Sequence, residues 1–420
     1  MKPLEGVKVI DLTQYLAAPA SCRVLAEWGA DVIKVEGFGG DPTRTQAAVY
    51  NMPYTDDENL GFDFANFNKR FISINLKTPE GMQVMDKLLQ TADIFVSSMR
   101  TKSLAKLGLD WDTIKEKYPQ ICYGQIVGYG EKGAEKDAAG YDVTCFCARG
   151  GIFGTTVNKG DAPMIPTNGL GDFGVGVMLA GGLVTALFNR TRTGKGDKVV
   201  IPLQHAGLFM LSTGIVSAQY GNQYPKSRME VPNPLNNVYR CKDGNWIVIC
   251  LPEYDRDYDK VMKLLGMDEW VGNTELNNCS YVNMHGLLSK VIGILDEGFA
   301  KYTLPEALKM FKDNDYPCEP ANTPLDIYKD QNVWDNDMLL KYSYPSGERI
   351  FPTNPVHFDS LGTPTYKSNG MCGAQTDEIM AEYGFTPEQT AQFKEAGAIK
   401  ANVPLAAPVS VEEFLAAQQK

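Results

Sequence analysis

One carboxylate of this 420-residue chain lies in a setting that suits covalent chemistry. Asp172 stands among the four glycines of residues 169–176, which read Gly-Leu-Gly-Asp-Phe-Gly-Val-Gly. The apolar run from Val175 to Phe188 predicts a buried helix, and a helix N-terminus favours an ionised acid. Glycines also let a ligand approach bare backbone. Asp172 is therefore predicted either to cap this helix or to attack a substrate, and we expect it to stay ionised at neutral pH.

The composition excludes several classes of partner. A net charge of −11 at pH 7 argues against nucleic acid or an anionic membrane, because both require a basic protein surface. The nine cysteines form no CxxC pair and no His-Glu-x-x-His spacing occurs, so neither a metal site nor a disulfide framework is predicted. The N-terminus lacks a signal peptide, and the apolar run at 174–188 is expected to be too short to span a membrane. We expect a soluble, cytoplasmic protein.

The elements that position Asp172 alternate between strand and helix. Apolar strands are predicted at residues 7–12, 31–36, 71–75, 94–97, 121–127 and 198–201, with helices at 20–29, from 79, at 101–107 and at 203–220. This alternation predicts an α/β fold with a parallel sheet. The turn after the first strand, Thr-Gln-Tyr-Leu-Ala-Ala-Pro, lacks the glycine fingerprint of a dinucleotide site, so NAD is not expected there.

The second half of the chain changes in character. Residues 221–237 are rich in Asn, Pro and Gly and predict a linker. A hairpin around Asp243-Gly244 and the helices that follow predict a smaller α+β domain up to about residue 317. Another hairpin at 342–351 and helices from residues 376 and 386 precede a final amphipathic piece at 409–418.

Other motifs compete with Asp172 for a chemical role. Residues 128–133 match G-x-G-x-x-G but precede no apolar helix, which predicts a turn or an active-site loop. Arg100 and Lys102 follow the strand at 94–97, at the carboxyl edge where open α/β sheets bind ligands. The three histidines have no recognisable nucleophile nearby and no nucleophile elbow occurs, so Asp172 remains the strongest candidate.

The chain resembles a known family over nearly its whole length, and the matching motifs follow one another in the same order. Its motifs are Leu4-Glu-Gly-Val-Lys-Val-Ile-Asp-Leu, Gly29-Ala-Asp-Val-Ile-Lys-Val-Glu, Gly40-Asp-Pro-Thr-Arg44, Asn68-Lys-Arg, Asn75-Leu-Lys77, Ala92-Asp-Ile, Gly128-Tyr-Gly, Gly140-Tyr-Asp, Gly169-Leu-Gly-Asp172 and Thr193-Gly-Lys-Gly. With them the chain resembles the class III (CaiB/BaiF-like) CoA-transferase family. Within that family, Arg100-Thr-Lys, Ala148-Arg-Gly-Gly151 and the Asp172 motif are most similar to a clostridial branch that acts on 2-hydroxy acids.

The resemblance implies an interlocked homodimer. Each chain would have a Rossmann-like large domain and a smaller α+β domain. Residues 1–220 would form the N-terminal part of the large, CoA-binding domain, and residues 221–320 the small domain with its linkers. Residues 321–420 would return to the large domain.

The resemblance also implies the chemistry. CoA would pass from an acyl- or enoyl-CoA donor to a 2-hydroxy carboxylic acid of the phenyllactate or 2-hydroxyisocaproate kind. Asp172 would be the nucleophile, forming an aspartyl anhydride and then an aspartyl-CoA thioester, with Tyr141 positioning the acyl carbonyl. The CoA thioester is a substrate, and no permanently bound cofactor is implied.

Contacts to CoA follow residue by residue. The positions that match the family's CoA site are Tyr15, Leu16, Ala17, Lys77, Met99 and Arg100. Gly37 replaces an arginine used by some relatives, so we expect Arg100 or Arg44 to compensate, with Lys102 beside them. Backbone N–H groups of the glycine-rich segments would stabilise oxyanions and their loop would exclude water, at Gly128, Gly130, Gly169 and Gly171.

Three alternatives remain open. The first is a CoA-transferase for a different carboxylic acid. α-Methylacyl-CoA racemases of the same superfamily pair the aspartate with a histidine where this chain has Tyr141, and a phenol, with an ordinary pKa of about 10, is a poor base at pH 7. A non-catalytic CoA-binding subunit is the alternative of another class, and the retention of Asp172 among its glycines argues against it.

Overall fold

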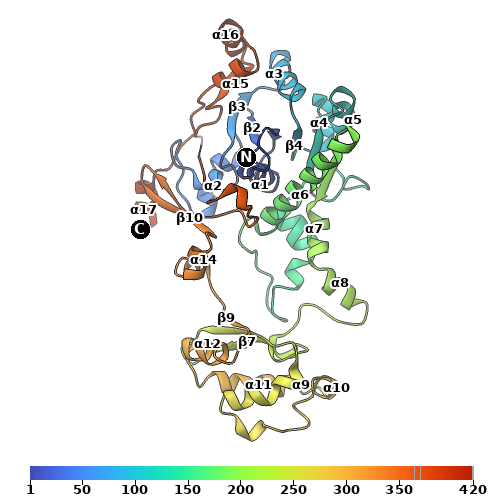
Figure 1. Ribbon diagram of the computed structural model, residues 1–420, viewed down its shortest axis with the longest axis vertical. Helices are drawn as coiled ribbons and strands as arrows, with labels where there is room; N and C mark the ends of the chain where they lie inside the picture. The colour runs from blue at the N-terminus through green and yellow to red at the C-terminus, as the bar shows by residue number, and fades with distance from the viewer. Residues whose placement is uncertain (364, 369, 419–420) are drawn as a thin grey trace. The chain divides into compact units, whose positions relative to one another are not determined.

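The computed structural model describes residues 1–363, 365–368 and 370–418 of the chain. They form two compact units (Figure 1). Unit 1 comprises Met1–Ile152, Ile165–Ile215 and Asn332–Lys420, and unit 2 comprises Phe153–Met164 and Val216–Gln331.

A seven-stranded sheet forms the centre of unit 1. Its strand order is β12-β3-β2-β1-β4-β5-β6, and every neighbouring pair is parallel except β12, which is antiparallel to β3. The strands are β1 (Lys8–Leu12), β2 (Asp31–Glu36), β3 (Arg70–Ile74), β4 (Ile94–Ser97), β5 (Cys122–Val127), β6 (Lys198–Pro202) and β12 (Ile399–Lys400). The chain therefore builds outward from β1 on one side, then returns to β4 and builds outward on the other. The mixed α/β fold with a largely parallel sheet agrees with the sequence prediction.

The helices named next lie wholly or partly in unit 1. They are α1 (Ala17–Glu27), α2 (Leu60–Asp63), α3 (Pro79–Gln90), α4 (Thr101–Leu107), α5 (Trp111–Lys117), α6 (Leu170–Thr193), α7 (Leu203–Met210), α8 (Ser212–Ala218), α14 (Gln331–Asp335), α15 (Thr376–Glu382), α16 (Pro387–Glu395) and α17 (Val411–Gln418). A hairpin of β10 (Leu339–Tyr344) and β11 (Gly347–Pro352) belongs to the same unit. The single helix predicted at 203–220 is two helices, because the chain turns at Leu211 after α7.

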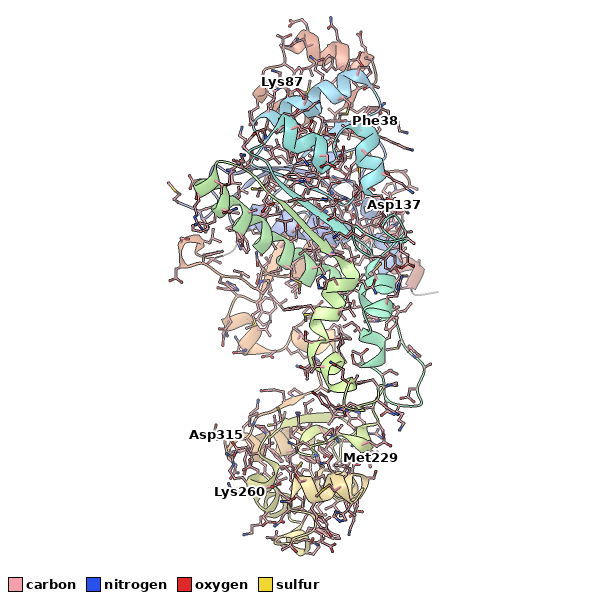
Figure 2. The ribbon with its side chains drawn as sticks, turned by 90° about the vertical axis from the view of Figure 1, so that its right-hand side faces the viewer. Phe38, Lys87, Asp137, Met229, Lys260 and Asp315 are labelled. Atoms are coloured by element: carbon pink, nitrogen blue, oxygen red, sulfur yellow. The ribbon has the colours of Figure 1, made fainter. Side chains whose placement is uncertain are left out.

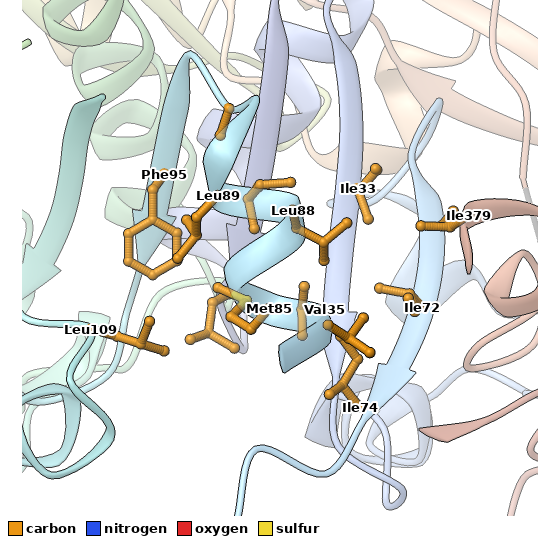
Figure 3. Close-up of a cluster of buried hydrophobic side chains, with 14 of the residues drawn as sticks. Ile33, Val35, Ile72, Ile74, Met85, Leu88, Leu89, Phe95, Leu109 and Ile379 are labelled. Carbon is orange, nitrogen blue, oxygen red and sulfur yellow. The ribbon is translucent and has the colours of Figure 1, made fainter. Parts of the chain in front are cut away.

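One face of the sheet packs against α3. Figure 3 shows Met85, Leu88 and Leu89 of α3 lying over strand residues that include Ile33 and Ile72. These side chains are essentially excluded from solvent, and burial of this much apolar surface is the main favourable term in folding. The helix starts as its sequence predicts, since Thr78 caps it and Pro79 is its first residue. The same cluster includes Ile379 and Ile399, so residues near the C-terminus complete the core of unit 1.

Helix α6 packs directly against α1. A Cβ placed on Gly176 would lie 2.8 Å from the Cβ of Ala20 and 2.9 Å from the carbonyl oxygen of Ala17, so only glycine allows this approach. By length and composition α6 could cross a membrane, with a mean hydropathy of 1.7 over 18 residues. The expectation that the apolar run is too short was therefore wrong. Its packing within unit 1 accounts for part of this apolar character, since 44% of that window is buried, and one such helix is weak evidence of a membrane span.

Unit 2 is a small α+β body. Its antiparallel sheet of β7 (Asn236–Arg240), β8 (Trp246–Cys250) and β9 (Cys318–Pro320) packs with helices around a separate apolar core. The helices are α9 (Tyr254–Leu264), α10 (Cys279–Met284), α11 (Leu288–Phe299), α12 (Leu304–Lys312) and α13 (Pro324–Ile327). Residues 153–164 group with this unit rather than with the large one, since Lys159 pairs with Glu230. In Figure 2, Met229, Lys260 and Asp315 mark this unit, and Phe38, Lys87 and Asp137 mark unit 1.

Candidate active site

A cavity of about 370 Å³ opens at the carboxyl ends of β1, β4 and β5. Residues 14–18 follow β1, residues 98–100 follow β4, and residues 126–128 end β5. Strands β1 and β4 are the neighbours between which the strand order reverses, and open α/β sheets bind ligands at this switch point. Asp172 lines the cavity.

Asp172 belongs to the first turn of α6 and is not its N-cap. The cap position is Gly169, whose φ of 80° lies in the left-handed region, and Asp172 is the third residue of the helix. The prediction that Asp172 occupies the cap was therefore wrong. No hydrogen bond is among the causes that act on its ionisation, and the residue is 9% exposed, so its carboxylate is available at the wall of the cavity.

A second carboxylate, Asp142, lies beside the first turn of α6. Its Oδ2 accepts a hydrogen bond of 3.3 Å from the backbone N–H of Gly171. A Cβ on Gly171 would lie 2.4 Å from Asp142 Oδ1, so the glycine is needed for this approach. Asp142 also lines the cavity. Because Asp142 already accepts the Gly171 N–H, the expected use of that group as an oxyanion donor is not supported.

Burial and the charge of Asp142 change the ionisation of Asp172. Burial, followed by the nearby Asp142 carboxylate, raises the pKa of Asp172 to about 7. Burial also raises the pKa of Asp142, opposed by the backbone N–H groups of Gly171 and Gly169. The expectation that Asp172 stays ionised at neutral pH is met only in part, because desolvation and the like charge outweigh its place at a helix N-terminus.

Two tyrosines form part of the cavity wall. The rings of Tyr15 and Tyr141 meet edge to face, with centroids 5.3 Å apart and an interplanar angle of 82°. Their hydroxyl oxygens are 3.5 Å apart. This contact, followed by burial, raises the pKa of Tyr15 to about 12, so its phenol is neutral at pH 7. Tyr141 directly precedes a π-helical turn at Asp142–Arg149, which the sequence analysis missed.

The structure brings together many of the residues singled out from the sequence. Those lining the cavity are Tyr15, Leu16, Ala17, Met99, Arg100, Gly128, Tyr141 and Asp172. Residues 169 and 171 belong to the α6 start beside it. Sequence reasoning gave no role to Asp142 or to Lys136, which also line it. Asp142 stood within the quoted Gly-Tyr-Asp motif, but nothing local showed that it would meet Gly171.

Other predicted contacts lie apart from the cavity. Lys77, Lys102 and Gly130 are absent from the lining formed by the described residues. Arg44 is buried and makes a bidentate pair with Glu36, with N–O distances of 2.7 and 2.8 Å. Its guanidinium also lies 3.7 Å from the centre of the Phe62 ring. Arg44 is thus committed to the interior, and the prediction that it replaces a CoA-binding arginine was wrong.

Arg100 and Lys136 are the two cations of the lining within the part of the chain that the structure describes. Both are exposed. Positive charge on the wall of the cavity suits a phosphorylated ligand. No group of three His, Cys, Asp or Glu side chains that could hold a metal ion occurs among the described residues.

Comparisons with known proteins place this geometry in context. A family model described as CoA-transferase family III matches residues 4–376. The chain is 40% identical over 393 residues to cinnamoyl-CoA:phenyllactate CoA-transferase of Clostridium sporogenes, covering 93% of this chain and 95% of the relative. It is 38% identical over 399 residues to (R)-2-hydroxy-4-methylpentanoate CoA-transferase of Clostridioides difficile, covering 94% and 99%. A CAIB/BAIF family protein from Brucella suis has a similar structure, with a TM-score of 0.76, 26% identity and coverage of 91% and 99%.

Proposed function

Because the chain belongs to CoA-transferase family III, we propose that it moves CoA from an acyl- or enoyl-CoA to a 2-hydroxy carboxylic acid, with Asp172 as the nucleophile. The observation that carries the proposal is the buried Asp172 carboxylate in the wall of the cavity at the switch point of the sheet. The two relatives named above act, by their names, on phenyllactate and on 2-hydroxy-4-methylpentanoate. These names support an acceptor with a hydroxyl beside its carboxylate.

The proposed reaction has four balanced steps. Asp172 attacks the donor thioester, and CoA leaves as a thiolate while a mixed anhydride forms. The thiolate then attacks the aspartyl carbonyl, which releases the donor acid and leaves an aspartyl-CoA thioester. The acceptor carboxylate attacks this thioester and forms a second anhydride with release of the thiolate. Attack of the thiolate on the acceptor carbonyl gives the product thioester and restores the Asp172 carboxylate.

In this proposal, other residues of the cavity bind the substrate and exclude water from the intermediates. Tyr141 positions the acyl carbonyl, and the segment 15–17 with Met99 contacts CoA. The loop that begins at Gly128 excludes water from the anhydride, which water would otherwise hydrolyse. Lys77 and Lys102 remain proposed contacts for the parts of CoA that extend beyond the cavity.

A substrate panel tests the acceptor class. Donor thioesters are incubated with free acids that include phenyllactate, 2-hydroxy-4-methylpentanoate, their analogues without the hydroxyl, and oxalate. We expect kcat/KM for the 2-hydroxy acids to exceed that for the dehydroxylated analogues by at least about tenfold, since a lost hydrogen bond to a polar site has roughly this cost. A preference for oxalate would reject the acceptor class, and racemisation without transfer would reject the reaction.

CoA affinity tests the role of Arg100. We expect Arg100→Ala to weaken binding of free CoA by about tenfold, since a charge-assisted contact to phosphate is lost. Isothermal titration calorimetry measures the change, with the exposed Lys115→Ala of α5 as a control of equal charge change. A dissociation constant that is unchanged in Arg100→Ala removes this residue from the CoA site.

We further propose that the protein is a cytoplasmic homodimer. Large apolar side chains are exposed on the helices of unit 1 that follow the site, namely Phe188, Leu208, Phe209, Met210 and Ile215. Exposed apolar patches of this kind mark interaction surfaces. A second copy of the chain is the proposed occupant, and the mass of the particle in solution tests this against a monomer of 46.3 kDa.

A further inference from the structure

The turn between β1 and α1 has an unusual backbone. It carries Tyr15, Leu16 and Ala17 into the lining of the cavity. Tyr15 has a φ of 66°, in the left-handed region. Such a conformation is costly for an aromatic residue, and it persists only where surrounding structure enforces it. Asp41 and Lys34 are the groups that enforce it at Tyr15.

Asp41 holds the backbone of Tyr15. Its Oδ1 accepts the Tyr15 N–H at 3.2 Å. The same oxygen accepts the Thr43 N–H at 3.0 Å and the Thr43 hydroxyl at 2.8 Å. Asp41 is only 1% exposed, so these bonds are shielded from competition with water.

Lys34 contacts both Asp41 and the turn between β1 and α1. Its Nζ lies 2.9 Å from Asp41 Oδ2, and both side chains are completely buried. The same Nζ donates to the carbonyl oxygen of Thr13 at 2.9 Å. Two buried charges are rarely the most stable way to fill a core, because desolvation offsets their attraction. Neither residue lines the cavity, so the chemistry does not need their charges directly.

The backbone conformation of Tyr15 determines where its ring and the neighbouring Leu16 contact the wall of the cavity. Tyr15 meets Tyr141 edge to face, and Tyr141 is the neighbour in sequence of Asp142. Leu16 lies against the start of α6, since a Cβ on Gly169 would be 3.0 Å from Leu16 Cδ1. A change of φ at Tyr15 would therefore displace the wall of the cavity on both sides of the turn.

We propose that Asp41, fixed by Lys34, is a positioning residue for CoA transfer. It keeps Tyr15 in the left-handed conformation and so sets the cavity wall beside Asp172. The inference rests on the proposed placement of the reaction at Asp172. Neither Asp41 nor Lys34 touches the reacting atoms.

A double-mutant cycle isolates this role. The two parent variants are Lys34→Met with Asp41→Asn, and Lys34→Met with Asp41→Ala. Both lack the Lys34–Asp41 pair, and Asp11, another buried carboxylate near Lys34, keeps its partner Lys69 at 2.9 Å. Neither variant therefore leaves an unpaired ion, and they differ in the acceptor for the Tyr15 N–H. Each is made with tyrosine and with glycine at position 15, because glycine adopts a positive φ without help.

With Tyr15 present, we expect the alanine variant to have a kcat/KM at least tenfold below that of the asparagine variant. With Tyr15→Gly in both, we expect the difference to fall below threefold. A merely structural role of Asp41 would give equal losses in the two backgrounds, which would overturn the proposal. Urea unfolding of each variant shows that every assay is made on folded protein.

Two controls distinguish an error in the proposed site from an error in the positioning role of Asp41. The buried pair of Arg23 and Glu27, with side chains 7% exposed and an N–O distance of 2.5 Å, is removed by Arg23→Met with Glu27→Gln. This variant is expected to lose stability and to keep kcat/KM within about threefold of the wild type. If Asp172→Ala keeps transfer activity, the proposed site is wrong. If it loses activity while the cycle shows no coupling, only the positioning role of Asp41 is wrong.

Discussion

Replacing Asp172 by alanine is expected to abolish CoA transfer, lowering kcat by about 10⁴-fold or more, the scale on which loss of a covalent nucleophile acts. Asp142 is the other carboxylate of the cavity lining among the described residues. It cannot take over, because its Oδ2 accepts the Gly171 N–H and its Oδ1 is buried against that glycine. The loss should therefore be close to complete.

The fold is expected to survive this substitution. Among the described residues, only burial and the charge of Asp142 act on the ionisation of Asp172, and no hydrogen bond contributes. The raised pKa of Asp172 means that burial disfavours its charged form. Removal of the carboxylate therefore removes a charge that destabilises the folded state at pH 8. We expect the Tm of Asp172→Ala at pH 8 to equal or exceed that of the wild type. Loss of activity together with a lower Tm would leave the nucleophile to be shown by trapping.

Trapping identifies the nucleophile directly. An aspartyl-CoA thioester or anhydride is attacked by hydroxylamine, which leaves a hydroxamate on the side chain and prevents further turnover. Incubation with acyl-CoA and hydroxylamine should therefore inactivate the wild-type enzyme, and peptide mass spectrometry should place the modification on Asp172. Omission of acyl-CoA is the control. A hydroxamate on any other residue, or transfer that continues in Asp172→Ala, contradicts the mechanism.

Local sequence patterns predicted the sheet well because its strands are short, apolar and separated by helices. The strands at 31–36 and 94–97 have the predicted bounds, and Thr78-Pro79 starts α3 as expected. In a parallel sheet the carboxyl ends share one edge. The segments that follow β1 and β4 could therefore be placed at one site before their side-chain contacts were known.

Long-range contacts explain what sequence reasoning could not predict. Glu36 and Arg44 are eight residues apart and pair in the interior, whereas the sequence shows only an arginine near a motif. Asp142 meets Gly171 across 29 residues, and that meeting changes the ionisation of the nucleophile. Helix propensity could not place the cap at Gly169 either, because aspartate is itself a favoured cap residue. The first two misses concern polar groups whose partners no local pattern identifies.

The pH profile of kcat/KM should reveal the ionisation of Asp172. The attacking form is the carboxylate, and its pKa in the free enzyme is about 7. Activity must therefore rise with pH through this value and fall about tenfold for each unit below it, to about 1% of its plateau at pH 5. An ordinary aspartate would keep the plateau down to about pH 5, because its pKa is near 4. The acid limb thus separates a buried nucleophile from an exposed one.

The Asp142→Asn variant tests whether the charge of Asp142 contributes to the raised pKa that sets the acid limb of the kcat/KM profile. The amide can still accept the Gly171 N–H, but it removes the negative charge that raises the pKa of Asp172. We expect the limb to move to lower pH by on the order of half a unit or more, and not to reach that of an ordinary aspartate, since burial is the larger cause. Glu116→Gln, which removes an exposed carboxylate on α5, should leave the limb in place. An acid limb near pH 4 in the wild type would show that the pKa of Asp172 is not raised, and a limb unmoved in Asp142→Asn would show that the charge of Asp142 does not act on Asp172.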